Sequence, residues 1–409
     1  MSLTWLLAMK SYEISKLTKC GLDGFISSKL VAKSRKYRWR SYYVFVLFFI
    51  FSIPNFSIAT ELFENWTSTR ALGMGNAFSA VVDDQHALWY NPAALDKIHG
   101  LHLTLIDLGI GTDAQNAYQT YNDATGSNYA TMIRNFFGKQ VWVGVSDSLG
   151  FAMHDFAIAA YDYLNLSFNL HNPAYANLNF NITNDVGFLA GTALSLVPGD
   201  SMRVGFTMKR ITRYGARLPF GPSTLATLSN TQLTQLAGNY GTGYGFDAGM
   251  LLELPIGVHP TLSAVWHDVG QTQFTPVAGT VKPPPMDNEA VLGYSMMFDA
   301  YVFKFIPAVD FKHANMQEEA LGKRLHFGAE FQFPGLSLRG GANQGYYTAG
   351  VGLDLKYMKI DAATYGVELN TYPGQLEDRR YMVNITIDLN FDPSIDLTRT
   401  PGAKVYQRR

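Results

Sequence analysis

Two adjacent pairs of residues, His154-Asp155 and His267-Asp268, have the side-chain types of a general base and the carboxylate that orients it. On a strand, neighbouring side chains point to opposite faces, so neither pair could act as one unit there. We interpret each pair as part of a turn or of a sheet surface. No Gly-x-Ser-x-Gly elbow occurs, and no His/Asp/Glu cluster has metal-ligand spacing along the chain. The sequence therefore predicts no catalytic residue, no metal site, no cofactor and no enzyme.

Charged residues also interrupt segments that otherwise alternate between apolar and polar, Lys209 and Arg339 being the main examples. If these segments cross a membrane as strands, a charge on the lipid face costs roughly 2–4 kcal/mol, so both side chains are expected to face a lumen or lie near a rim. There they could pair with inward carboxylates, or hold a ligand carboxylate or an N-terminal plug. The candidate carboxylates are Asp247, Asp310, Glu330, Asp354 and Asp361.

The elements that would position these side chains are strands, because the dominant hydrophobic period after residue 100 is two. Residues 381–391 show it best: six apolar residues alternate with five mostly polar ones, over the roughly 9–11 residues that a tilted membrane strand needs. About 14 such segments occur, an even number that suits a closed antiparallel barrel. Their expected ranges are 101–110, 139–152, 155–168, 179–196, 202–213, 241–254, 260–270, 288–298, 301–313, 323–333, 336–342, 346–355, 358–368 and 381–391.

An export signal precedes the strands. Five basic residues between 33 and 40 are followed by an apolar run over 42–53, and small residues end at Ala59, where we expect signal cleavage. Residues 1–59 hold nine of the 32 Lys/Arg and two of the 33 Asp/Glu, so the remaining chain has a net charge of −8. It also loses Cys20, the single cysteine. This excludes disulfide scaffolds and thiol catalysis, and an acidic chain does not favour nucleic acid as a partner.

A compact stretch rich in small residues, 68–95, lies between the export signal and the strands. It contains Gly73-Met74-Gly75-Asn76, the paired acids Asp83 and Asp84, and the turn-forming unit Asn91-Pro92-Ala93. The order Arg-Ala-Leu-Gly-Met-Gly-Asn-Ala-Phe, Asp-Asp, Tyr-Asn-Pro-Ala-Ala-Leu resembles the N-terminal hatch of the FadL-like outer-membrane proteins. The alternative is a glycine-rich loop before a soluble β domain.

The resemblance continues through the second half, where 325–331, 338–346, 349–353 and 266–270 look like the PorV and UPF0164-type members of that superfamily. It implies an all-β transmembrane barrel whose lumen holds a hatch with gating residues Gly73, Gly75, Asn76, Asp83, Asp84, Asn91, Pro92 and Ala93. The implied domains are a leader over 1–59, the hatch over 60–98, the barrel over 99–391 and a polar tail over 392–409.

The family implies a location in the outer membrane and two alternative functions. One is passive uptake of hydrophobic small molecules, such as fatty acids or hydrocarbons. The other is a non-transporting scaffold for exported proteins. Further partners would be membrane lipid and the barrel assembly machinery. Two excursions from the strand pattern, 111–138 and 222–239, are expected to form either a lid over the barrel or an access groove for a greasy ligand.

Overall fold

The computed structural model describes residues 61–113 without 63, 140–171, 177–197, 201–220, and 238–391 without 280 and 301. The predicted leader with its cleavage site at Ala59, the polar tail over 392–409 and most of the two excursions lie outside the described residues. The described residues all belong to one compact unit.

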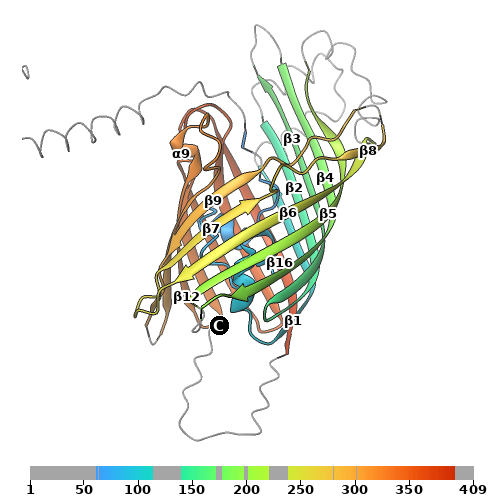
Figure 1. Ribbon diagram of the computed structural model, residues 1–409. Coiled ribbons are helices and arrows are strands. Elements are labelled where there is room, and N and C mark those ends of the chain that lie inside the picture. The colour runs from blue at the N-terminus through green and yellow to red at the C-terminus, as the bar shows by residue number, and fades with distance from the viewer. Residues whose placement is uncertain are drawn as a thin grey trace, which may run out of the picture. The chain divides into compact units, whose positions relative to one another are not determined.

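Fourteen antiparallel strands form a closed barrel within the described residues, and two short extra strands flank it (Figure 1). The extra strands are β8 (Thr275–Ala278), paired with β6, and β10 (Phe298–Asp299), paired with β11. The wall consists of β1 (Leu101–Thr112), β2 (Gln140–Met153), β3 (Phe156–His171), β4 (Asn177–Ser195), β5 (Met202–Phe220), β6 (Tyr240–Glu253), β7 (Thr261–His267), β9 (Glu289–Ser295), β11 (Lys304–Phe311), β12 (Leu325–Phe333), β13 (Leu336–Asn343), β14 (Tyr346–Asp354), β15 (Met358–Glu368) and β16 (Glu377–Phe391).

The barrel closes where its first and last strands meet. β1 pairs with β16 from Leu101↔Phe391 to Thr112↔Tyr381, with one irregularity between Thr104 and Ile106. Each remaining wall strand pairs with its two neighbours in the chain, and β9 joins β11 across the short β10. Closure leaves no free sheet edge along the wall, which is the arrangement that avoids unpaired backbone groups.

Side chains alternate between the two faces of the wall, as the sequence pattern predicts. On β16, Tyr381, Val383 and Ile385 are 49%, 49% and 41% exposed, whereas the intervening Met382 and Asn384 are buried. Other wall strands repeat the pattern, so the outer surface is a band of exposed apolar residues and the polar side chains face inward. This is the distribution of a barrel whose outside meets lipid.

All of the predicted strands have a counterpart, although several ends differ. The segment predicted over 202–213 continues to Phe220, and the one predicted over 260–270 ends at His267, because Asp268 has a left-handed backbone (φ 47°). The wall is uneven in height: β4 and β5 each contain 19 residues, whereas β7 and β9 each contain 7 (Figure 1).

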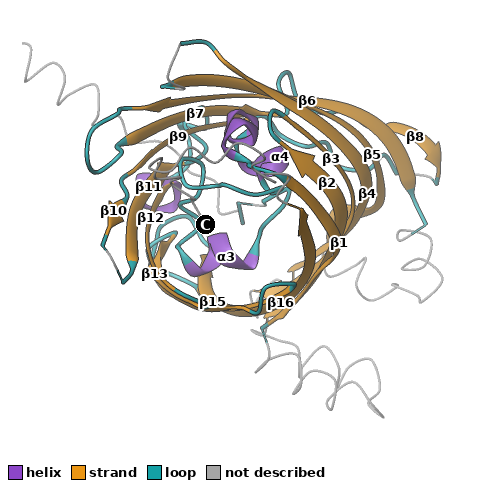
Figure 2. Ribbon diagram, turned by 90° about the horizontal axis from the view of Figure 1, so that it is seen from below, coloured by secondary structure: helices purple, strands orange, loops and turns teal. Residues whose placement is uncertain are grey.

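The described residues before β1 lie inside the barrel, seen in Figure 2 as short helices and loops within the ring of strands. We call residues 61–98 the hatch. It contains two short α-helices and a 3-10 helix: α3 (Thr69–Gly73), capped by the Ser68 side chain, α4 (Ala87–Tyr90), and η1 (Pro92–Lys97), capped by the Asn91 side chain. A further short helix, α9 (Leu321–Arg324), precedes β12. No described helix combines the length and hydrophobicity needed to cross a membrane.

Candidate functional site: the seated hatch

Glycines bring the hatch into direct backbone contact with the wall. A Cβ atom added to Gly73 would lie 3.1 Å from the Cα of Gly350 on β14. Gly75 has φ 65°, and a Cβ there would collide with the carbonyl oxygen of Phe327 on β12. A side chain on Gly328 of β12 would in turn meet the Met74 carbonyl. Glycine is thus required at Gly75 by both contact and backbone conformation, whereas a side chain at Gly73 would make a tight contact with β14.

The predicted Asn91-Pro92-Ala93 motif contacts β5 and β6, away from the strands that Gly73 and Gly75 contact. Asn91 is fully buried; its Oδ1 accepts from the Ala93 amide at 3.1 Å, and its Nδ2 donates to the carbonyl of Ser79 at 3.1 Å. A Cβ on Gly205 of β5 would meet the backbone of Pro92, and one on Gly249 of β6 would meet Asn91. The Asn91-Pro92-Ala93 turn therefore lies directly against two strands.

A chain of ion pairs joins the hatch to strands β12, β13 and β15. Arg70 donates to both carboxylate oxygens of Glu330 on β12, at 3.1 and 2.8 Å, and to Asp83 at 2.7 Å. Glu330 also accepts from Arg339 of β13 at 2.6 Å, and Arg339 reaches Asp361 on β15. Because Glu330 is fully buried, its charge depends on these two guanidinium groups.

His86 joins the hatch to β1. Its Nδ1 lies 2.9 Å from Asp84 Oδ1 and its Nε2 lies 2.9 Å from Asp107 Oδ2. Burial lowers the pKa of His86, but the two carboxylates outweigh this effect and hold that pKa well above its usual range. Burial likewise opposes the charged form of Asp84, and His86 with Arg70 reverses this and lowers the pKa of Asp84. The seated hatch therefore favours an imidazolium between two carboxylates.

Two further wall residues, Asp310 and Arg203, bind polar groups of the hatch. Asp310 on β11 accepts from the backbone amides of Phe78 and Ser79 at 2.9 and 2.8 Å, which closes the turn after the glycine motif. Arg203 on β5 reaches Asp96 at the end of η1. Asn76, with φ 61°, is buried and accepts from the Tyr90 hydroxyl at 3.4 Å.

Lys209 lies in the lumen, and within the described part of the chain its ion pairs are with Asp247 and Asp268 rather than with the hatch. Its Nζ is 2.8 Å from both Asp247 and Asp268, and His267 Nδ1 is 3.5 Å from Asp247. Opposite faces apply only within a strand, and β7 ends at His267, so Asp268, with its left-handed backbone, turns back toward the lumen. His154-Asp155 forms the turn between β2 and β3.

Not every charge expected in the lumen lies there. Asp354 is exposed at the end of β14, where it accepts from the Lys356 amide at 3.0 Å. Sequence reasoning missed Asp107, Arg203 and Asp96; an Asp among the apolar residues of 101–110 was the one available indication for Asp107.

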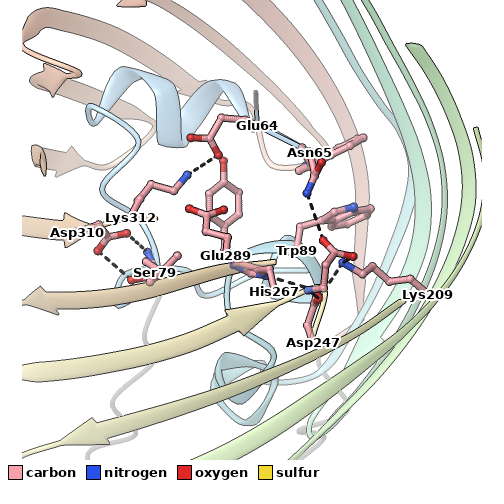
Figure 3. A pocket seen from close by; sticks show the side chains of 14 residues that line it. Glu64, Asn65, Ser79, Trp89, Lys209, Asp247, His267, Glu289, Asp310 and Lys312 are labelled. Atoms are coloured by element: carbon pink, nitrogen blue, oxygen red, sulfur yellow. Dashed lines mark hydrogen bonds and ion pairs between the residues drawn. The ribbon is translucent and has the colours of Figure 1, made fainter. Parts of the chain in front are cut away.

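Lys209, Asp247, Glu289, Asp310 and Lys312 border a small cavity between hatch and wall (Figure 3). Its volume is about 40 Å³, and its lining combines charged side chains with the rings of Trp66, Trp89 and Tyr90. Ligand pockets commonly measure roughly 300–1,000 Å³, whereas one water needs roughly 10–15 Å³ of such space. The cavity thus suits a few water molecules and is too small for a hydrocarbon.

Aromatic rings form an apolar contact between the hatch and β3. Trp66 and Trp89 stack with ring centroids 4.6 Å apart. Tyr161 of β3 meets both of them edge-on at 5.4 and 5.7 Å, and Tyr163 lies 5.5 Å from Trp66. We call these four residues the aromatic seam. In this part of the hatch–wall boundary the contact is made by aromatic rings.

Comparison with known proteins gives structural matches without sequence matches. No protein-family model matches the chain, and a search of curated proteins finds no match. Among solved structures, the chain is similar to the monoaromatic hydrocarbon channel CymD, with 13% identity, coverage of 78% of this chain and 96% of that one, and a TM-score of 0.47. It is also similar to the Ralstonia pickettii toluene transporter TbuX, with 13% identity, coverage of 80% of this chain and 98% of that one, and a TM-score of 0.46. A third similar structure is a Pseudomonas aeruginosa FadL homologue, with 13% identity, coverage of 81% of this chain and 100% of that one, and a TM-score of 0.35.

These structures are of the FadL and hydrocarbon-channel type that the sequence resembles. The finer likeness to PorV stays a prediction. At such identities and TM-scores the matches do not bear on what this chain binds, and its fold rests on its own strand pairing.

Proposed function

We propose that the protein is an outer-membrane channel for passive uptake of hydrophobic small molecules, with the hatch as its gate. The observation that carries the proposal is the aromatic seam. In this seam Trp66 and Trp89 of the hatch and Tyr161 and Tyr163 of β3 offer ring faces and edges to one another. A planar or chain-like apolar ligand can replace such contacts, each worth about 0.5–1.5 kcal/mol beyond burial.

The gating part of the proposal is supported by how the hatch is held. The attachments that join the described hatch residues to the wall are hydrogen bonds, ion pairs, ring contacts and close backbone contacts, all of them non-covalent, so the hatch can shift while the barrel stays closed. The 40 Å³ cavity beside it has no room for a fatty acid or an aromatic hydrocarbon. Passage of such a molecule therefore requires the hatch to move.

The outer face supports the location. An exposed apolar band surrounds inward polar side chains, and burying that band in lipid removes it from water. A water-filled barrel without a plug would admit ions freely. With the hatch seated, we expect the intact protein to show little conductance in planar bilayers.

The test compares two glycine substitutions that differ in one respect. Gly75 and Gly270 both have left-handed backbones, with φ 65° and 80°, but a side chain at Gly75 collides with the wall whereas Gly270 has nothing within 4 Å. We expect Gly75→Val to change uptake of a labelled fatty acid or toluene into cells that lack other channels for it. The matched control Gly270→Val should leave uptake at the parental rate.

A scaffold for exported proteins gives a different result in the same experiment. Neither the parent nor Gly75→Val would then raise uptake above that of cells without the protein, and an exported protein would co-purify with the barrel. Large steady conductance of the intact parent would contradict both functions, because each requires a seated hatch.

A further inference from the structure

Three side chains from separate segments converge beside the polar cavity. Glu64 belongs to the hatch before α3, Glu289 is the first residue of β9, and His313 lies just beyond β11. One ligand atom of each lies within 4.8 Å of the other two. His313 Nε2 is 3.6 Å from Glu289 Oε1 and 4.0 Å from Glu64 Oε1. More than 200 residues separate Glu64 from the other two, so spacing along the chain could not reveal the cluster.

The atoms that converge have no hydrogen-bond partner among the described residues. This holds for Glu64 Oε1, Glu289 Oε1 and His313 Nε2, although His313 and Glu289 are 4% and 8% exposed. Buried polar atoms are normally satisfied, and leaving one unpaired is costly. Distances of 3.6 and 4.0 Å exceed those of a hydrogen bond, so a proton on His313 does not join these groups.

A metal ion explains the spacing. Zinc binds imidazole nitrogen and carboxylate oxygen at about 2.0–2.2 Å, and in a tetrahedral site this places ligand atoms about 3.4 Å apart. We propose that Glu64, Glu289 and His313 bind a divalent transition-metal ion, with zinc as the best match to two carboxylates and one imidazole. Glu64 and Glu289 also line the cavity, which leaves the fourth position to water (Figure 3).

The surrounding charges are consistent with a cation. Lys312 Nζ bonds Glu64 Oε2 at 2.6 Å, which leaves the other oxygen of that carboxylate for the ion. With Lys312 counted, the two glutamates retain one negative charge, and Asp310 lies on the adjoining strand β11. Two unbridged carboxylate oxygens within 4.8 Å repel each other, and an ion between them removes this cost.

The site gives the hatch a metal-dependent attachment. Glu64 moves with the hatch, whereas Glu289 and His313 belong to the wall, so the ion joins the two. This attachment does not depend on what passes through the barrel. It holds equally for a channel and for a scaffold, and the two proposals therefore fail or survive separately.

Metal analysis of the full chain tests the proposal. The protein is purified in detergent with a tag that contains no histidine, stripped with EDTA, reloaded with Zn²⁺ and desalted, and its metal content is measured by mass spectrometry. We expect about one zinc per chain in the parent. His313→Asn and Glu289→Gln should weaken zinc binding by more than about 100-fold, since loss of even an outer-shell partner costs about 10–100-fold. Cobalt loading should give visible d–d absorption that both variants lose.

The matched control is His102→Asn on β1, whose ring contacts Asp388 and the His99 carbonyl instead. It should bind zinc as the parent does. Gel mobility before and after boiling reports whether each barrel has formed. If both wall variants fail to assemble, Glu64→Gln, which lies outside the strands, decides the question. Absence of stoichiometric zinc in the parent, or equal zinc in parent and assembled variants, would overturn the proposal and leave adventitious metal only.

Discussion

Arg70 of the hatch and Glu330 of β12 are joined by two parallel hydrogen bonds, Nε to Oε1 and Nη2 to Oε2, across 260 residues of sequence. The carboxylate is fully buried, and Arg339 holds it from the other side. Such bidentate pairs are strong and geometrically specific. This pair fixes the rotation of α3 relative to the wall.

Replacing Arg70 with Gln should loosen the hatch while the barrel persists. Removing one partner of a buried ion pair typically destabilises a protein by about 3–5 kcal/mol. Because Arg339 still bonds Glu330, we expect a loss at the lower end of this range. Planar-bilayer recordings should show increased conductance relative to the parent. Arg379→Gln is the control, because Arg379 bonds the Tyr347 carbonyl and makes no hatch contact that we describe. Equal conductance of parent and Arg70→Gln would show that this pair does not hold the hatch.

The His86 contact predicts release of the hatch at alkaline pH. The pKa of His86 is raised in the seated hatch, so its contribution to seating is complete below the unfolded value of about 6.5 and is lost as pH rises through the raised folded value. Conductance should therefore increase toward high pH. His86→Asn should remove most of that dependence, because an amide does not titrate. A pH profile unchanged by His86→Asn would assign the effect to other groups.

Two substitutions of Asn91 distinguish its role as the cap of η1 from the hydrogen bonds that its amide group donates to the hatch and the wall. Asn91→Ala loses the cap and both amide donors, and loss of such a cap alone costs about 0.5–2 kcal/mol. Asn91→Asp retains the capping oxygen but places a buried negative charge against the carbonyls of Ser79 and Met250. Limited proteolysis of the solubilised protein should cleave the hatch faster in the Asp variant than in the Ala variant. The reverse order would mean that the cap dominates.

The end of β16 should matter for assembly. Phe391 is 54% exposed and pairs with Leu101 where the barrel closes. Phe391→Asp puts a charge among interfacial aromatics and should reduce the amount of heat-modifiable barrel in the outer-membrane fraction, whereas Phe391→Leu should not. Recovery of the parent as a soluble periplasmic protein would contradict the proposed location altogether.

Most of the wall could be predicted because strand alternation is a local property. The apolar and polar residues of 381–391 define two faces whatever they pair with, and Gly75 marks a backbone that other residues rarely adopt. The strands β8 and β10 were missed, since Pro276 interrupts the first and the second has two residues.

Partners could not be predicted, because they depend on which residues meet after closure. Lys209 and Arg339 were expected to face inward, but nothing in the sequence connects Arg70 to Glu330 or His86 to Asp107. In the sequence, Asp354 and Asp361 are both acids in alternating segments. In the structure Asp354 is exposed at the end of β14, whereas Asp361 bonds Arg339 in the lumen. Strand ends and register decide this difference, and both are set by the whole sheet.

The position of the hatch immediately before β1 constrains the order in which the protein assembles. Once β1 and β16 pair from Leu101↔Phe391 to Thr112↔Tyr381, the wall is continuous around the hatch. We therefore expect seating of the hatch to be coupled to barrel closure. Contacts such as Arg70 with Glu330 span most of the chain, and such non-local contacts form slowly. The hatch can thus serve as a template around which the last strands curl, so variants that weaken its contacts should slow assembly as well as open the pore.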